Sequence, residues 1–131
     1  MNEATVTITG NVATQPENRS TERGDPMVRF RLACTPRRHD RASDSFVDLE
    51  TSFVTVVCFR SLAENVLASI GKGDPVVVSG RLRVLERERE GRSSLSVQVD
   101  AHAIGHDLNR GTTTFSRVKR ETSQAGNAAA A

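Results

Sequence analysis

Apolar and polar residues alternate along five stretches of this chain, and a period of two residues predicts β-strands. The first stretch, 4–12, places Val6, Ile8 and Val12 on one side and threonines on the other, which predicts a half-buried strand. Gly10 interrupts this stretch and indicates a bend or a bulge. The other four predicted strands cover residues 27–35, 49–59, 75–87 and 93–104.

A single segment, 61–70, has the period of an amphipathic helix instead. Ser61 is placed to cap its first turn, and Gly71 and Gly73 are placed to end it. A β-rich chain interrupted once by a short helix has the element order of an oligonucleotide/oligosaccharide-binding barrel, or OB-fold. We therefore expect an all-β, five-stranded OB-fold barrel with one short helix between its third and fourth strands. The apolar stripe of the helix consists of Leu62, Ala63, Val66, Leu67 and Ile70.

The connecting segments indicate where the domain ends and where loops lie. Residues 36–48 are polar and basic and too many for a tight turn, and long loops inside compact domains often carry function. Residues 86–91 have the alternating charge of a hairpin tip, and apolar periodicity fades after Gly105. We expect a domain over 1–109, an extension over 110–121 in which a short strand around 112–118 is one alternative, and a disordered tail over 122–131.

Charge is informative through its distribution and not through its total. The 131 residues include 18 basic and 16 acidic side chains, so the net charge of +2 does not by itself indicate a nucleic-acid partner. Residues 29–41, however, contain five arginines and only one acid, Asp40. Such a cluster is either an ordinary solvated face or part of a path for phosphates. The five arginines are Arg29, Arg31, Arg37, Arg38 and Arg41.

Several classes of function find no support in the sequence. Cys34 and Cys58 lie in apolar runs and are expected to be buried thiols in a reducing compartment. His102 and His106 are four residues apart, a spacing that shares a face on a helix but not on a strand, so we expect no metal site. No catalytic constellation, phosphate-binding loop, signal peptide or membrane-length apolar run is visible. We therefore expect a soluble cytoplasmic protein that is not an enzyme, with no cofactor and no membrane partner.

The aromatic residues are all phenylalanines, because the chain has no Trp and no Tyr. Phe30 shares the parity of its apolar neighbours and is expected in the core. Phe46 lies in the polar loop, where no core is at hand. Phe53 and Phe59 share one face of the third predicted strand, and exposed aromatic rings of this kind are platforms on which nucleic-acid bases stack. Phe115 has no clear place from the sequence.

Five short motifs follow one another in order over about residues 3–105. They are Thr-Val-Thr-Ile-Thr-Gly-Asn-Val at 5–12, Phe-Arg-Leu-Ala at 30–33, Leu-Ala-Glu-Asn at 62–65, Lys-Gly at 72–73 and Val-Ser-Gly-Arg-Leu-Arg at 78–83. Together they resemble the bacterial single-stranded DNA-binding proteins. The resemblance implies an OB-fold homotetramer that coats and protects single-stranded DNA without sequence preference, in replication, recombination or repair, and is associated with the nucleoid. It implies neither a metal nor a nucleotide cofactor.

The resemblance also implies a binding surface. Members of this family stack bases on Trp, Tyr or Phe in the basic loop and the third strand, where this chain has His39, Phe46, Phe53 and Phe59. The segment 36–41 looks most like actinobacterial members, and 108–120 looks like an extra strand with which those members clamp neighbouring subunits. The residues expected to contact phosphates are Arg29, Arg31, Arg37, Arg38, Arg41, Lys72, Arg81 and Arg83.

Two departures from the family pattern qualify these expectations. No tryptophan occupies a stacking position, and Phe and His offer less stacking area than Trp. Members of the family usually end in an acidic, apolar tip that recruits repair enzymes, whereas this chain has no acid after Glu121. We therefore expect a specialised paralogue, acting in stress, recombination or DNA uptake, whose recruitment of repair enzymes is in doubt.

Three alternatives remain open from the sequence. The barrel could be a protein-interaction module that has lost its ligand, or a dimeric binder of RNA or of the primosome type. The ribbon 83–92 is either an extension of the binding groove or a solvated hairpin of alternating charge.

Overall fold

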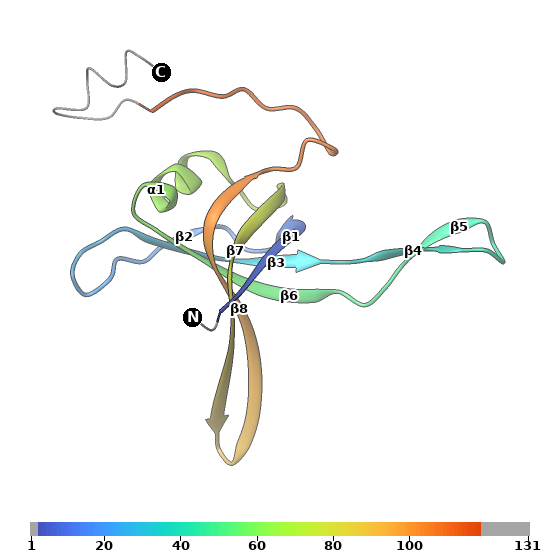
Figure 1. Cartoon of the computed structure of the whole chain (residues 1–131), viewed down its shortest axis with the longest axis horizontal. Helices are drawn as coiled ribbons and strands as arrows, with labels where there is room; N and C mark the ends of the chain where they lie inside the picture. The colour runs from blue at the N-terminus through green and yellow to red at the C-terminus, as the bar shows by residue number, and fades with distance from the viewer. Residues whose placement is uncertain (1–2, 119–131) are drawn as a thin grey trace.

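The computed structural model describes residues 3–118, and its elements follow the predicted order with several additions (Figure 1). The described elements are β1 (Ala4–Val12), β2 (Glu17–Asn18), β3 (Met27–Cys34), β4 (Arg37–Asp40), β5 (Ser45–Asp48), β6 (Ser52–Phe59), α1 (Arg60–Ser69), β7 (Pro75–Arg89) and β8 (Arg92–His106).

Five long strands close into a barrel. They are hydrogen-bonded in the order β1-β7-β8-β6-β3, and β3 returns to pair with the end of β1, so the ring of strands is complete. Only β6 and β8 run parallel to each other within this ring. The prediction of a five-stranded barrel with a helix between its third and fourth long strands is therefore confirmed. The two-residue strand β2 adds to the other side of β3.

The core consists of the inward-facing residues of every barrel strand. Phe30 on β3 lies opposite Val56 on β6, which lies opposite Val99 on β8, and all three are buried. Helix α1 closes one end of the barrel with Ala63 and Val66, both part of the same apolar cluster. This packing confirms the predicted core position of Phe30 and the predicted apolar stripe of the helix, except for Leu67, which is exposed.

The two cysteines are free thiols with different environments. Cys58 is buried in the core, and burial raises the pKa of its thiol to about 11. Cys34 is only partly buried, and burial also raises its pKa. The prediction of buried thiols is therefore confirmed for Cys58 and only partly for Cys34.

Gly10 allows β1 to pass from one neighbour to another. The strand pairs with β7 along most of its length and with β3 through Asn11 and Val12. A Cβ atom at position 10 would lie 2.6 Å from the carbonyl oxygen of Ala33, so only glycine permits this approach of β1 to β3. The predicted bend at Gly10 is thus the corner at which the barrel closes.

A bulge between β7 and β8 keeps the apolar residues of both strands facing the core. Ser79 lies opposite Ala103 but Gly80 lies opposite Ala101, so His102 is an extra residue on β8. One inserted residue reverses the side of the sheet on which all later side chains lie. The bulge therefore brings Val99, at an odd position, and Ile104, at an even position, onto the same inner face.

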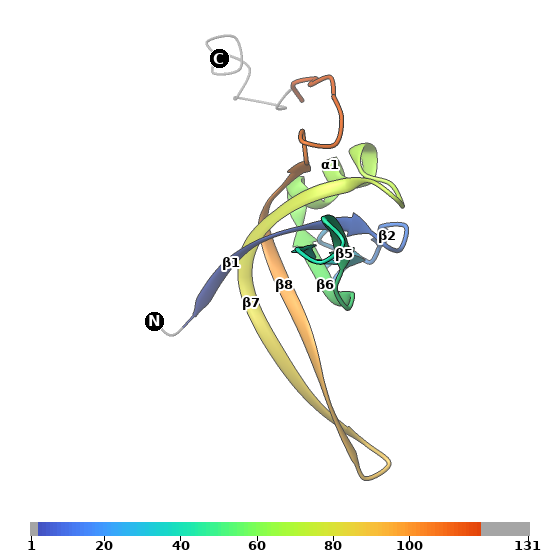
Figure 2. The ribbon, with the colours of Figure 1, turned by 90° about the vertical axis from the view of Figure 1, so that its right-hand side faces the viewer.

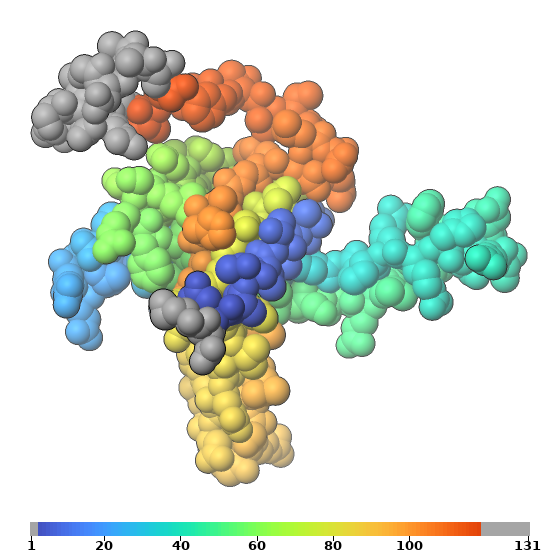
Figure 3. Space-filling view, viewed as in Figure 1, coloured from blue at the N-terminus to red at the C-terminus, as the bar shows by residue number. Residues whose placement is uncertain are grey.

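The segment 36–48, expected as a loop, is instead a β-hairpin formed by β4 and β5. It continues the ladder of β3 and β6, because the Leu49 amide donates to the Pro36 carbonyl at 2.7 Å and the Thr35 and Thr51 hydroxyls lie 2.6 Å apart. Both this hairpin and the long end of the β7–β8 ladder project from the barrel as separate arms (Figures 1 and 2). In the space-filling view both arms stand clear of the barrel (Figure 3).

Two further expectations about element ends were wrong. Phe59, not Ser61, occupies the N-cap position of α1, and no side chain caps the helix there. The reason is that the β3–β6 pairing continues to Arg60, whose amide donates to the Pro26 carbonyl, so that the helix begins directly at the strand end. Residues 112–118 form no strand in this single chain, and the predicted tail over 122–131 lies outside the described residues.

We expect Gly80→Ala to destabilise the fold by about 3 kcal/mol or to prevent folding, because the added Cβ would overlap the backbone of Asp100 and Ala101. Gly105→Ala is the matched control, since nothing lies within 4 Å of a Cβ there. Urea unfolding of both variants at equal protein concentration measures the difference. Equal stability of the two variants would contradict this account of the bulge.

Candidate nucleic-acid interface

The outer face of the barrel gathers predicted site residues from strands far apart in the sequence. The strand register places Arg31 of β3 opposite Thr55 of β6, Thr55 opposite Gln98 of β8, and Gln98 opposite Arg83 of β7. Side chains of opposed residues point to the same side of a sheet. One continuous surface, which we call the outer face, therefore carries Arg31 at one side and Arg83 at the other.

Phe53 lies exposed on this outer face. Its side chain is 51% accessible, and the Arg31 guanidinium carbon lies 5.1 Å from the centre of its ring. A cation over an aromatic ring leaves the opposite side of that ring free, and the guanidinium retains N–H groups that can bind phosphate. The pair therefore presents a stacking surface and a phosphate-binding group at one place.

The β4–β5 hairpin carries a second aromatic site. His39 and Phe46 are cross-strand partners whose ring centres lie 5.5 Å apart in an edge-to-face arrangement. Arg37 lies on the same face, with its guanidinium carbon 5.5 Å from the Phe46 ring, and Phe46 is 63% accessible. Two acids contact these side chains: the Asp48 carboxylate lies 3.2 Å from Arg37 Nε, and the Asp44 carboxylate lies 3.1 Å from His39 Nε2.

The structure does not bring every predicted site residue to these two places. Arg38 lies on the opposite side of the hairpin from His39, and Arg41 lies in its turn. Phe59 shares the outer parity of Phe53 but lies at the other end of β6, about 20 Å away along the strand. The remaining two are Arg29, which lies half-buried on the outer face opposite Val57 and away from the Phe53 ring, and Lys72, which is exposed in the turn between α1 and β7.

Arg81 and Arg83 are present on the outer face, but an acid accompanies them. Arg81 lies 2.9 Å from the Asp100 carboxylate and 3.8 Å from that of Glu3, and Arg83 lies 3.6 Å from Asp100. The hydrogen bond and charge of Asp100 raise the pKa of Arg81. Sequence reasoning missed Asp100, because nothing in the chain order indicates that it lies between these arginines.

The projecting part of β7 and β8, which we call the ribbon (residues 83–98), separates its charges by face. The sequence 86–90 alternates glutamate and arginine, and alternation along a strand places the two kinds of residue on opposite sides. The arginines extend the outer face, whereas the glutamates share the other face with exposed apolar residues. The outer side carries Arg83, Arg87, Arg89 and Arg92, and the other side carries Val84, Glu86, Glu88, Leu95 and Val97.

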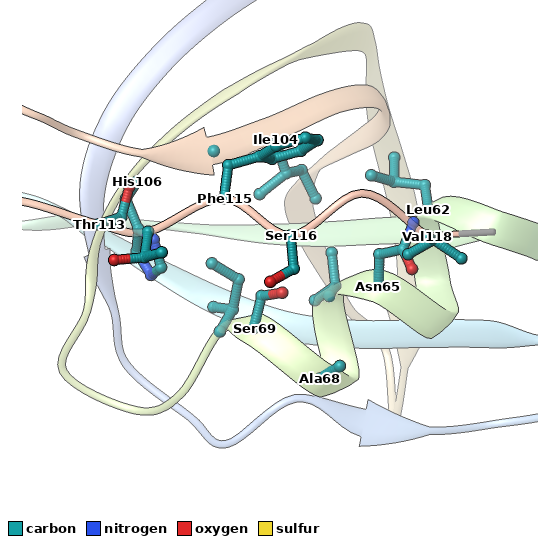
Figure 4. Close-up of a pocket in the computed structure, with 14 residues that line it drawn as sticks. Leu62, Asn65, Ala68, Ser69, Ile104, His106, Thr113, Phe115, Ser116 and Val118 are labelled. Carbon is teal, nitrogen blue, oxygen red and sulfur yellow. The ribbon is translucent and has the colours of Figure 1, made fainter. Parts of the chain in front are cut away.

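A cavity of about 860 Å³ lies elsewhere, between α1, the end of β8 and the extended segment 113–118. Figure 4 shows Leu62 and Asn65 of the helix on one side of it and Phe115 reaching over Ile104. None of the predicted DNA-contacting residues lines this cavity. The cavity is therefore separate from the candidate interface, which is the open outer face.

The described residues include neither a helix long and apolar enough to cross a bilayer nor a cluster of three or more metal-ligating side chains.

A closed five-stranded barrel with a helix after its third long strand, and with exposed aromatic rings beside arginines, defines an OB-fold of the kind that binds nucleic acids. The chain matches the model of the Single-strand binding protein family over residues 3–107 and belongs to that family.

Individual relatives and solved structures agree with this assignment. The chain is 48% identical over 126 residues to Single-stranded DNA-binding protein 2 of Streptomyces avermitilis, covering 96% of this chain and 79% of the relative. It is 51% identical over 120 residues to Single-stranded DNA-binding protein 1 of Streptomyces coelicolor, covering 92% and 76%. The predicted resemblance to actinobacterial members is confirmed.

Two solved structures of relatives share the fold. A small single-stranded DNA-binding protein from Streptomyces coelicolor superimposes with a TM-score of 0.78 at 50% identity, covering 85% of this chain and 100% of the other. The second single-stranded DNA-binding protein of Mycobacterium smegmatis gives a TM-score of 0.62 at 34% identity, covering 91% and 100%. The OB-fold assignment is confirmed by these similarities.

Proposed function

We propose that this chain binds and protects single-stranded DNA without sequence preference during replication, recombination or repair. The observation that carries this proposal is the pairing of exposed Phe53 with Arg31 on an outer face that continues to Arg83. Stacking tolerates any base, because every base has a flat face, whereas a duplex hides those faces in its own stack. The printed names of the relatives support the same ligand.

The hairpin and the ribbon extend this binding surface in different ways. His39 and Phe46 supply a second stacking place beyond the barrel, and the arginines on the outer side of the ribbon prolong the path for phosphates. Of the two alternatives for the ribbon, strand parity favours an extension of the binding groove and not a merely solvated hairpin. The reason is that the glutamates of the ribbon lie on the side facing away from the DNA path. A longer DNA strand that wraps around the protein would also reach the outlying contacts, which are Arg38, Arg41, Lys72, Arg29 and Phe59.

The active form is a homotetramer, because several barrels together can wrap a longer strand than one barrel. The extension 110–121 acts as a clamp on a neighbouring subunit. Two observations support this role: the segment has no strand partner in the described part of its own chain, and Phe115 is 80% accessible. The protein works in the cytoplasm, on the nucleoid, and needs neither catalysis nor a cofactor. It serves as a specialised paralogue.

Replacing Phe53 tests the proposed ligand. We expect Phe53→Ala to weaken binding of a short oligo-dT by about 5- to 150-fold, since each stacked base contributes roughly 1–3 kcal/mol. Fluorescence anisotropy at two salt concentrations, with matched duplex and oligo-U, measures affinity and preference. Leu67→Ala, an exposed apolar change on α1, should leave affinity unchanged.

Three outcomes of that titration would contradict the proposal. Equal affinity for duplex would show that stacking is not used. Stronger binding of oligo-U would favour an RNA binder, and no binding of any strand would favour a protein-interaction module.

The ribbon provides a second test. We expect Arg87→Gln with Arg89→Gln to lower the salt slope of oligo-dT binding by about 1.4, because each phosphate on a single strand contributes about 0.7. The matched control, Glu86→Gln with Glu88→Gln, changes the opposite side of the same strand and should leave the slope nearly unchanged. A titration from low to high salt gives both slopes, and equal and opposite changes would mean that only net charge matters.

The clamp provides a third test. We expect Phe115→Ser with Val118→Ser to shift the protein from tetramer toward smaller species, because both side chains are exposed in the single chain and would lose their apolar contacts with a neighbour. Sedimentation velocity over a range of concentrations measures the shift. Leu67→Ser is the control, and an unchanged tetramer in the double variant would refute the clamp.

A further inference from the structure

Asp100 occupies the middle of the outer face. It lies opposite Arg81 on β7 and opposite Val57 on β6, and its side chain is only 16% accessible. Both carboxylate oxygens are used: Oδ1 accepts a hydrogen bond from Gln98 Nε2 at 2.8 Å, and Oδ2 accepts one from Arg81 at 2.9 Å. The same Oδ2 lies 3.6 Å from Arg83.

Asp100 is ionised in this position. Burial by itself raises the pKa of the Asp100 carboxyl. The hydrogen bonds from Gln98 and Arg81, together with the charges of Arg83 and Arg81, lower the pKa by a larger amount, so the net pKa lies below its usual range. A full negative charge therefore lies between two arginines that the phosphate path requires.

The placement of this acid is specific to the outer face. Its two hydrogen-bond donors and Arg83 come from residues on the outer face, and the bulge at Gly80 makes Arg81 its direct cross-strand partner. With Glu3 also 3.8 Å from Arg81, the β7 part of the path is close to neutral before any ligand binds. Arg31 differs, because the described residues offer it the Phe53 ring and no carboxylate within ion-pair distance.

We infer that Asp100 is a positioning residue and an internal counterion for the nucleic-acid site, a role that rests on the function proposed above. It holds the Arg81 and Arg83 head groups on the outer face. Its negative charge also offsets the positive charge of these arginines, which would otherwise attract a phosphate. When single-stranded DNA binds here, Arg81 or Arg83 exchanges its ion pair with Asp100 for a contact with a phosphate. Binding therefore releases fewer salt ions than the number of arginines suggests. Affinity at this place consequently depends more on base stacking at Phe53 and less on salt.

The principal test removes the charge of Asp100 and keeps its shape. We expect Asp100→Asn to tighten oligo-dT binding roughly tenfold at about 20 mM salt and to steepen the salt slope by about 0.7, the contribution of one phosphate. Glu88→Gln, which removes one negative charge from the far side of the ribbon, on the neighbouring strand β7, should change neither quantity appreciably. An unchanged slope or weaker binding in Asp100→Asn, or an equal effect in Glu88→Gln, would overturn the inference.

A second pair of variants leaves Asp100 in place, so it applies even if Asp100→Asn does not fold. Arg31→Gln should lower the salt slope by about 0.7, whereas Arg81→Gln should lower it by clearly less, because Asp100 already cancels the charge of Arg81. Equal losses would overturn the inference. A merely structural role for Asp100 would alter unfolding temperature and would not separate these two slopes.

The wild-type titration distinguishes this inference from the proposed function. If wild type binds oligo-dT and Phe53→Ala weakens it, the proposed function holds, and the slopes alone decide the role of Asp100. If wild type does not bind single strands, the proposed function fails and the counterion role fails with it.

Discussion

The pairing of β7 with β8 is the interaction on which most of this structure depends. The two strands, each 15 residues long, form one wall of the barrel and then continue beyond it as the ribbon. The bulge opposite Gly80 keeps Val78 and Leu82 facing inward together with Ile104 and Val99. Without the extra residue, one half of this ladder would turn its apolar side chains to water and its arginines to the core.

The same ladder organises the charges. A chain with a net charge of only +2 becomes one-sided, because strand parity separates arginines from glutamates along the ribbon. On the barrel itself the separation of acidic from basic residues is incomplete, since Asp100 shares the outer face with Arg81 and Arg83. The charge of the outer face is therefore graded, from nearly neutral beside Asp100 to strongly basic at the end of the ribbon.

The aromatic residues divide between a rigid and a projecting part of the molecule. Phe53 belongs to the barrel wall, where β3 and β8 support β6 on both sides, and Arg31 holds its ring from one side. His39 and Phe46 belong to the β4–β5 hairpin. Among the described residues, β4 and β5 pair with each other and with no third strand. Such an isolated hairpin has little stability of its own, so a bound strand can adjust it more easily than it can adjust the barrel.

The sequence by itself determined the β-barrel class, the five long strands, the single helix and the aromatic and basic residue types of the site. These features are local: alternation, helical spacing and glycine positions are readable from neighbouring residues. The hairpin at 36–48 was not predicted because β4 is polar throughout and β5 has one apolar residue on each side, so neither short strand has the apolar alternation that marks a half-buried strand. The change of apolar parity between Ala101 and Ile104 was the one local signal that could have indicated the bulge.

Only the tertiary structure decided which of the candidate residues meet. The outer face joins Arg31, Phe53 and Arg83 from strands more than 20 residues apart in the chain, and it separates Phe59 and Arg38 from them. It also decided that Asp100 lies between two arginines. The physical reason is that register across a closed barrel depends on every strand pairing around the ring at once, and no single segment contains that information.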